Sequence, residues 1–192
     1  MLVFHNPAHR LHQGRREMFR GRLVPCVETP ERLEQVLAEL RRRPVGPVSA
    51  PTEPADLDAM LAQIHSPRYL EFLAGAWDEW LALDPANAEL DALPSVWPGR
   101  GFRHDLLPRN FAARMGLFGF DAGTPVTAGA WPAARAGAGC AMAAARAGHR
   151  RRPQCLRADP PAGPPCGRGL LRRLLLPEQF GPCRADAARC RR

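Results

Sequence analysis

Residues 118–147, FGFDAGTPVTAGAWPAARAGAGCAMAAARA, decide how the chain folds. Residues 121–125 combine aspartate, glycine and proline in the pattern of a tight turn. The part from Ala128 onward is dominated by alanine, the best helix former, and predicts a long helix up to Ala147. Pro132 fits this helix if the helix begins close to it, because proline is tolerated in a first turn. A turn that leads into a long helix is typical of an α/β domain, in which the helix supports a strand.

The charge divides the chain after residue 147. The formal net charge is +8, from 27 basic residues, all of them arginine, and 19 acidic ones. Residues 148–192 contain 11 arginines and three acidic residues, and so carry the whole excess. Because the remainder is neutral, the charge does not indicate a nucleic-acid surface on the folded part. We expect a folded domain in residues 1–147 and a disordered arginine- and proline-rich tail in residues 148–192.

Four of the six cysteines lie in the tail, with no close C-x₂₋₄-C pair and no secretion signal at the N-terminus. A structural zinc site and a disulfide framework are therefore not expected. No apolar run approaches the length needed to cross a membrane. The sequence predicts a soluble cytoplasmic protein without a membrane partner.

The apolar spacing predicts an α/β order of elements. Leu33, Val36, Leu37 and Leu40 recur at helical spacing and predict one buried face. Many large apolar residues follow Ser66 and Pro67, which predicts a helix buried in the core or against a partner subunit. We expect strands at residues 2–4 and 45–51, helices at residues 31–43, 57–64, 67–81 and 128–147, and long loops at residues 5–22 and 84–108.

Three histidines lie close together in the first polar loop, at His5, His9 and His12. Their spacings of four and three, without a cysteine or a paired carboxylate, are not a usual metal-ligand set. We interpret them as solvated loop histidines.

Several motifs resemble one family in order and spacing. They are HSPRYLEFL at residues 65–73, AWDEW at 76–80, VWPGR at 96–100, FDAGTPVTAG at 120–129, and Trp131. The resemblance covers about residues 2–147 and is to the N-terminal part of bacterial acetylpolyamine amidohydrolases. This family is the branch of the histone deacetylase superfamily that acts on small acetylated amines.

The resemblance implies a three-layer α/β/α arginase/deacetylase fold, incomplete in this chain, mostly helical in the part present and irregular in the tail. It also implies a homodimer that hydrolyses acetylated polyamines or acetyl-lysine-like amines. The family holds zinc with two aspartates and one histidine, and uses a tandem histidine pair and a tyrosine. No catalytic or metal residue can be placed here, and no histidine follows His149. We expect this chain to hold no metal, to be inactive as it stands, and to be poorly soluble alone.

One residue carries over from the family. In RREMFRG at residues 15–21, Glu17 falls where relatives place an acidic residue on the entrance loop. The resemblance assigns Glu17 to substrate binding, where it would hold the far ammonium of a polyamine. A solvated loop glutamate is the alternative. The family also implies an acid near Ala112, where this chain has none.

The tail has the composition of a shifted reading frame. Back-translation of residues 161–166 with free third bases, started one base later, can read Pro-Pro-Gly-His-His-Ala, the catalytic motif of the family. Residues 170–180 can then read Tyr-Cys-Gly-Gly-Tyr-Cys-Phe-Leu-Asn-Asn-Ser. The slip would lie between Gly148 and Pro161.

Two other functions remain open. The arginine-rich tail could bind nucleic acid or an acidic partner on a degenerate scaffold, although its match to a shifted frame argues against nucleic acid as a partner. Alternatively, the chain could pair with a full-length relative as a subunit-interaction protein, through the region of Trp77, Trp80 and Trp97.

Overall fold

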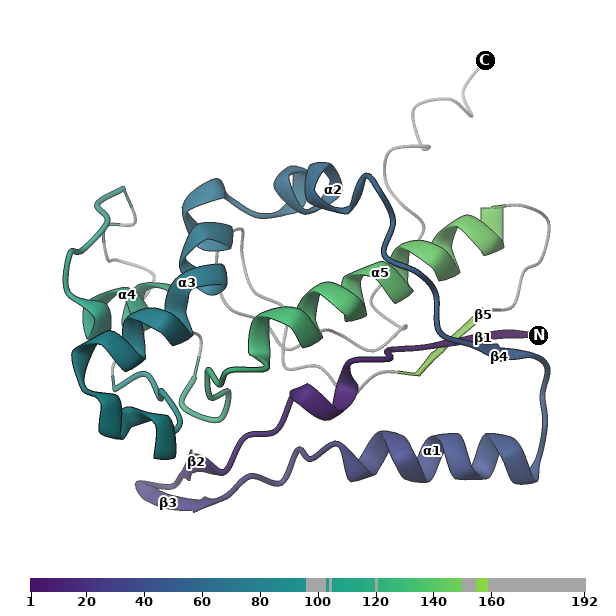
Figure 1. The fold of residues 1–192 in the computed structure, drawn as a ribbon, viewed down its shortest axis with the longest axis horizontal. Helices are drawn as coiled ribbons and strands as arrows, with labels where there is room; N and C mark the ends of the chain where they lie inside the picture. The colour runs from purple at the N-terminus through teal and green to yellow at the C-terminus, as the bar shows by residue number, and fades with distance from the viewer. Residues whose placement is uncertain (96–102, 104, 120, 150–154, 159–192) are drawn as a thin grey trace.

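The computed structural model describes residues 1–95, 103, 105–119, 121–149 and 155–158 (Figure 1). The strands are β1 (Leu2–His5), β2 (Arg16–Phe19), β3 (Arg22–Pro25), β4 (Val48–Ser49) and β5 (Cys155–Ala158). The helices are α1 (Glu31–Arg42), α2 (Leu57–Ile64), α3 (Pro67–Leu83), α4 (Phe111–Phe118) and α5 (Ala130–His149), with short 3-10 turns η1 (His9–Leu11) and η2 (Pro85–Glu89).

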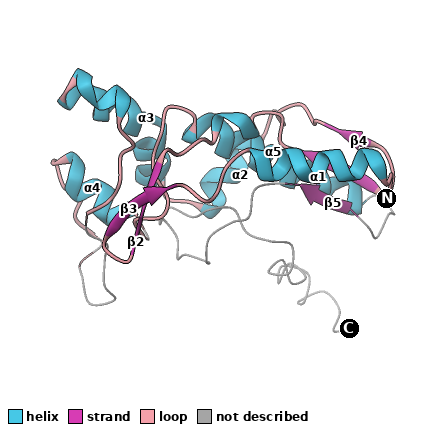
Figure 2. Ribbon diagram, turned by 90° about the horizontal axis from the view of Figure 1, so that it is seen from below, coloured by secondary structure: helices cyan, strands magenta, loops and turns pink. Residues whose placement is uncertain are grey.

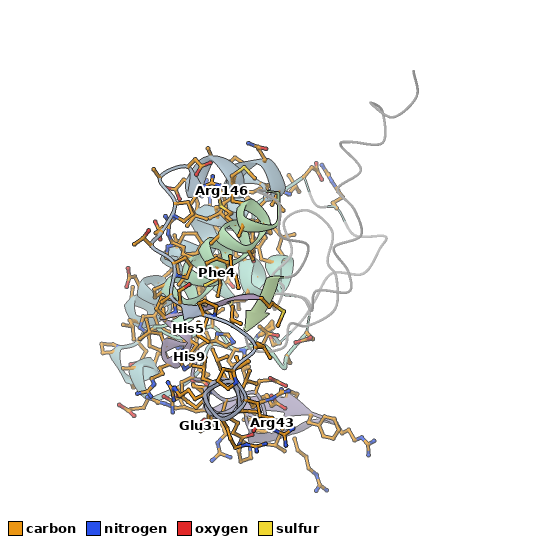
Figure 3. The ribbon with its side chains drawn as sticks, turned by 90° about the vertical axis from the view of Figure 1, so that its right-hand side faces the viewer. Phe4, His5, His9, Glu31, Arg43 and Arg146 are labelled. Atoms are coloured by element: carbon orange, nitrogen blue, oxygen red, sulfur yellow. The ribbon has the colours of Figure 1, made fainter. Side chains whose placement is uncertain are left out.

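The described part is layered, with a parallel sheet between two helices. The sheet has the order β4-β1-β5, and both pairings of the central strand β1 are parallel. Helix α5 covers one face of the sheet and α1 lies on the other, as Figure 1 and the end-on view in Figure 3 show. Parallel strands need helical connections that cover their faces, which explains this arrangement.

The end of the molecule that holds the sheet β4-β1-β5, here called the sheet end, has an apolar interior. Val3 on β1 is fully buried, and Leu33 and Leu37 on α1 are buried beneath the sheet. The predicted buried face of α1 is confirmed at these two leucines, whereas Val36 is 44% exposed. The buried face of α1 is therefore narrower than predicted.

A second core fills the other end of the molecule, where α3, α4 and the start of α5 meet (Figure 1). Aromatic rings dominate it: Phe118 stacks on Phe72 with ring centroids 4.8 Å apart, and Tyr69 lies 5.7 Å from Phe118. Trp80 stacks on Phe111 at 5.7 Å. Of the large apolar residues of α3, Tyr69, Phe72 and Leu73 are buried in this core, as one of the two predicted alternatives has it, whereas Trp77 and Trp80 are half-buried.

The two ends are joined where α5 begins. A Cβ on Gly129 would lie 1.8 Å from the carbonyl oxygen of Leu11, so only glycine allows this close approach. Farther along α5, the Ala133 carbonyl accepts a hydrogen bond from the Asn6 side chain at 3.0 Å. Pro132 falls in the first turn of α5, where its missing N–H breaks no helical bond.

The structure differs from the sequence-based expectations in three places. The loop expected at residues 5–22 contains a hairpin, β2–β3, whose turn residues Arg20 and Gly21 have φ of 50° and 76°. Two residues of positive φ match the twist of a tight hairpin, and Gly21 was the one signal for it. Helix α4 was not predicted, because its eight residues follow a loop without apolar periodicity. Strand β5 lies inside the stretch expected to be irregular.

Some expectations cannot be compared with the structure. The motif at residues 96–100 and almost all of the tail lie outside the described residues. Within the described ranges, no helix combines the length and hydrophobicity needed to span a membrane.

Candidate functional site

The hairpin β2–β3 carries Glu17, the one substrate-binding residue predicted from the sequence. Glu17 lies in β2 opposite Val24 of β3, and both residues are half-buried. The neighbouring residues Met18 and Leu23 face the other way and are exposed. Side chains alternate across a hairpin, so Glu17 lies on the face turned toward the rest of the molecule. Figure 2 shows the hairpin beside the α3 and α4 end.

The foot of the hairpin packs against the turn that precedes α5. A Cβ on Gly14 would lie 2.6 Å from Pro125 Cγ and 2.7 Å from Cys26 Sγ, so the backbone approaches both closely. Within the turn, Asp121 Oδ1 accepts hydrogen bonds from the Gly123 N–H at 2.8 Å and the Thr124 hydroxyl at 3.2 Å. The turn chemistry predicted from residues 121–125 is therefore present, and it supports the hairpin.

The outer edge of β2 is also occupied. The Met18 N–H donates to the Ala122 carbonyl at 3.0 Å. Asp91 Oδ2 accepts from the Arg15 N–H at 2.5 Å and from the Arg16 N–H at 2.9 Å. The strand with Glu17 is thus bonded along both edges, by β3 on one side and by Asp91 and Ala122 on the other.

A second polar cluster lies at the carboxyl end of β1. Strands β1 and β5 run parallel and end together at His5 and Ala158, and this edge of an α/β sheet is where ligands usually bind. His5 Nδ1 is buried, and no described residue forms a hydrogen bond with it. The Asn6 side chain accepts from the Ala8 N–H at 2.9 Å and donates to α5, so it fixes the turn that leaves the strand.

His9 is buried, so its interpretation as a solvated loop histidine was wrong. Its Nδ1 lies 2.9 Å from the Asn6 carbonyl oxygen and its Nε2 lies 2.8 Å from Glu34 Oε1. Each ring nitrogen of His9 therefore lies within hydrogen-bond distance of an oxygen atom. The Arg10 guanidinium donates to the same carboxylate oxygen at 2.8 Å. Figure 3 shows His5 and His9 between α1 and α5.

The electrostatics of this cluster are dominated by Glu34. Hydrogen bonds from Arg10 and then from His9 lower the pKa of the Glu34 carboxyl to about 2. A carboxylate held between two donors stays ionised through the neutral range. The contacts of His9 and Arg10 with Glu34 join η1 to α1, and these groups are structural because they are paired with one another.

The described residues do not form a metal site. No group of three or more histidine, cysteine, aspartate or glutamate side chains among them could hold a metal ion. His5, His9 and His12 are therefore not brought together as ligands. Zinc needs at least three such ligands, so the described part of the chain does not fit the metal that the resemblance implies.

Comparison with known proteins identifies relatives over three quarters of the chain. Acetylpolyamine amidohydrolase 2 of Pseudomonas aeruginosa is 38% identical over 142 residues, which are 74% of this chain and 40% of that protein. Acetylpolyamine amidohydrolase 1 of the same organism is 36% identical over 149 residues, 75% of this chain and 40% of that protein. The acetylpolyamine amidohydrolase of Mycoplana ramosa is 31% identical over 134 residues, 70% of this chain and 38% of that protein. The chain is homologous to the acetylpolyamine amidohydrolases.

The structural comparison agrees with this homology. The crystal structure of an acetylpolyamine aminohydrolase from Burkholderia pseudomallei superposes with a TM-score of 0.69 and 29% identity, covering 80% of this chain and 42% of that chain. The predicted arginase/deacetylase fold is confirmed for the described part. No family model matches the chain. The chain spans about 40% of the length of the curated acetylpolyamine amidohydrolases it matches.

Sequence reasoning found Glu17 but missed the residue that anchors its strand. Asp91 lies 74 positions from Glu17 in the sequence, inside a stretch interpreted as a long loop without structure. The sequence shows only that Asp91 is negatively charged. The structure adds that the next residue, Ala92, is buried. No local pattern reports a side chain that accepts from backbone N–H groups of a distant strand.

Proposed function

We propose that residues 1–147 belong to an amide hydrolase that removes acetyl groups from acetylated polyamines or similar acetylated amines. The 38% identity to acetylpolyamine amidohydrolase 2 over 142 residues carries this proposal. The superposition on a solved acetylpolyamine aminohydrolase supports it independently of the alignment. The proposal includes zinc as the metal, a homodimeric assembly and a cytoplasmic location.

Within this proposal, Glu17 binds the substrate. A polyamine with one acetylated end keeps a protonated amine at the other end at neutral pH. The Glu17 carboxylate, half-buried on a strand bonded along both edges, is suited to that ammonium. A fixed carboxylate loses less side-chain freedom on pairing than one on a mobile loop.

The described residues do not supply the hydrolysis itself. They offer no metal-ligand group, and we assign no catalytic step to them. The proposal therefore includes a second element, that residues 148–192 are read in a shifted frame and that the catalytic motif is encoded in the other frame.

The position of β5 supports the shifted frame. Started one base later, the codons of residues 156–160 can read Tyr-Ala-Leu-Thr-Arg, and those of residues 161–166 can read Pro-Pro-Gly-His-His-Ala. The arginine then stands directly before the two prolines, as in the family motif. The apolar run falls on β5 (Cys155–Ala158), and a parallel strand inside an α/β sheet is usually apolar. The present frame has Arg157 there, so we narrow the slip to residues 148–156.

The test begins with the gene. Sequencing from codon 140 through about 600 bases past codon 192, enough for the remaining part of a relative of this size, should show a frame that continues through the two histidines. The frame-restored protein should release acetate from N-acetylputrescine, and a metal chelator should abolish this. The matched control replaces both restored histidines by alanine, which should abolish turnover without changing the circular dichroism spectrum.

The outcomes separate the two elements. A single uninterrupted reading frame without the histidines overturns the shifted frame. A restored frame whose product binds zinc but leaves N-acetylputrescine intact overturns the substrate assignment and keeps the frame.

A further inference from the structure

Strand β2 is bonded on its outer edge by groups that do not belong to a strand. In an antiparallel pair, the residues whose N–H groups face away from the partner alternate along the strand. The outward N–H groups of Arg16 and Met18 fit this alternation, and they find Asp91 Oδ2 and the Ala122 carbonyl oxygen. The Asp91 carboxylate thus acts in place of a third strand at the start of β2.

Asp91 is itself held by the core. The next residue, Ala92, forms an isolated antiparallel bridge with Val126, in which each N–H donates to the carbonyl of the other at 3.1 and 2.9 Å. Both residues are 1% exposed and belong to the aromatic core of α3 and α4. The backbone from which the Asp91 side chain extends is therefore held next to a buried bridge.

Glu17 follows directly after Arg16, whose N–H is bonded to Asp91. Glu17 lies between Arg16 and Met18, whose N–H groups are bonded at the outer edge of β2 to Asp91 and Ala122. The backbone of Glu17 itself faces Val24 in β3. The position of its carboxylate therefore depends on whether the outer edge stays bonded. The Arg15 N–H also donates to Asp91 Oδ2, so Asp91 holds the backbone at two consecutive residues, Arg15 and Arg16.

We propose that Asp91 is the positioning residue for Glu17, holding the β2 strand so that the Glu17 carboxylate meets the distal ammonium of an acetylated polyamine. The inference rests on the proposed function, since it assumes that Glu17 contacts substrate. Asp91 is not expected to touch the substrate, because its Oδ2 already accepts two backbone N–H groups. Its effect on binding should therefore pass entirely through Glu17.

A double-mutant cycle tests this on the 192-residue chain. The four proteins are the unmodified chain, Glu17→Gln, Asp91→Ala and the double variant. Calorimetric titration with N-acetylputrescine should show about fivefold weaker binding for each single variant, as for one exposed charge pair. The double variant should lose no more than about fivefold, because residues that act as one unit are not additive. N-Pentylacetamide, which has a methyl group in place of the ammonium and the same length, should bind all four equally.

Hydrogen exchange supplies a second readout. In Asp91→Ala, the amide protons of Arg16 and its neighbours should exchange at least tenfold faster, since an opened edge leaves them to water. Glu17→Gln should leave these rates unchanged. Glu89→Ala is the matched control, because it removes only the exposed Arg15–Glu89 ion pair of 3.4 Å from the same segment. It should change neither exchange nor binding.

Each result decides the inference. Additive losses in the cycle would mean that Asp91 acts apart from Glu17, and would overturn it. Binding that is weakened by Glu17→Gln but kept by Asp91→Ala would overturn it while the proposed function stands. A failure of the unmodified chain to discriminate the ammonium ligand from the neutral one would overturn both the inference and the role of Glu17.

Discussion

The two ends of the molecule are built from contacts of different range. The aromatic core of α3 and α4 has nine buried members, all within residues 69–126. At the sheet end, β1 pairs with β4 through Val3 and Val48, and with β5 through Val3 and Leu156, about 150 residues later in the chain. Among the described residues, the buried cluster on α1 contains Leu33 and Leu37.

This difference bears on the order in which the contacts of the two ends can form. Contacts between nearby residues lose little entropy on closure, whereas long-range strand pairing must close a large loop before it gains anything. The aromatic core is therefore expected to form before the sheet, and it supports the hairpin through the Ala92–Val126 bridge. The sheet end, where β1 and β5 end together, depends on pairing between strands about 150 residues apart in the chain.

The largest expected effect comes from opening the aromatic core. Phe118→Ala removes a fully buried ring that stacks on Phe72, and should lower the free energy of unfolding by about 3–5 kcal/mol. Leu37→Ala at the sheet end should cost about 2 kcal/mol, the low end for buried leucine, because few buried neighbours surround it. Pulse proteolysis in urea measures both, with the exposed Val36→Ala as control. Equal losses of unfolding free energy in the two variants would contradict the difference between the two ends.

The next effect concerns the joint between the two ends. Gly129→Ala forces a methyl group against the Leu11 carbonyl, and should cost about 1–3 kcal/mol through overpacking. Gly75→Ala is the matched control, because nothing lies within 4 Å of its Cβ position on α3. It should stabilise the chain by about 0.5–1 kcal/mol, since glycine is a poor helix former. The same urea titration should therefore show shifts of opposite sign, and a stabilised Gly129→Ala would mean that the joint is not tight.

A smaller effect is expected where α5 meets the acidic turn before α2. Arg135 pairs with Glu53 and Asp58 and its side chain is 21% exposed, whereas Arg146 pairs with Asp56 and is 50% exposed. Arg135→Met should cost about 1 kcal/mol and Arg146→Met less than about 0.5 kcal/mol, because exposed ion pairs contribute little. The difference should shrink in 1 M salt. A larger loss for Arg146→Met would contradict this order.

The smallest expected effect is a pH dependence. The pKa of Glu34 is lowered to about 2 by Arg10 and His9. A lowered folded-state pKa gives stability that is present above the unfolded value of about 4.5 and is lost as the pH falls toward 2. The melting temperature of Glu34→Gln should lie below that of the unmodified chain at pH 6, and the gap should close between pH 4.5 and 2. A gap that is constant over this range would rule out the ionised pair as its source.

The sequence was informative where a pattern is local. The alanine-rich composition of α5, the Ser66–Pro67 start of α3 and the apolar face of α1 each follow from residues within a few turns, and the structure contains all three helices. The family motifs gave the fold, and the role of Glu17 that they imply stays a prediction.

The parts that escaped prediction depend on contacts between distant residues. His9 is polar and close to a proline, so nothing local indicates that Glu34 of α1 will bury it. Asp91 accepts from a strand 75 positions away, and its role exists only after the hairpin and the Ala92–Val126 bridge have formed. Side-chain bonds of this kind are tertiary, and neither propensity nor periodicity reports them.

The position of β1 has a consequence for synthesis on the ribosome. β1 is made first, yet one of its two neighbours, β5, follows about 150 residues later, which at 5–20 residues per second is a delay of about 8–30 s. The described buried residues of the aromatic core, and the start of α5 that packs on them, have all been made by residue 131. The nascent chain should therefore order its middle before its beginning, and its first apolar strand should be a binding site for chaperones during that delay.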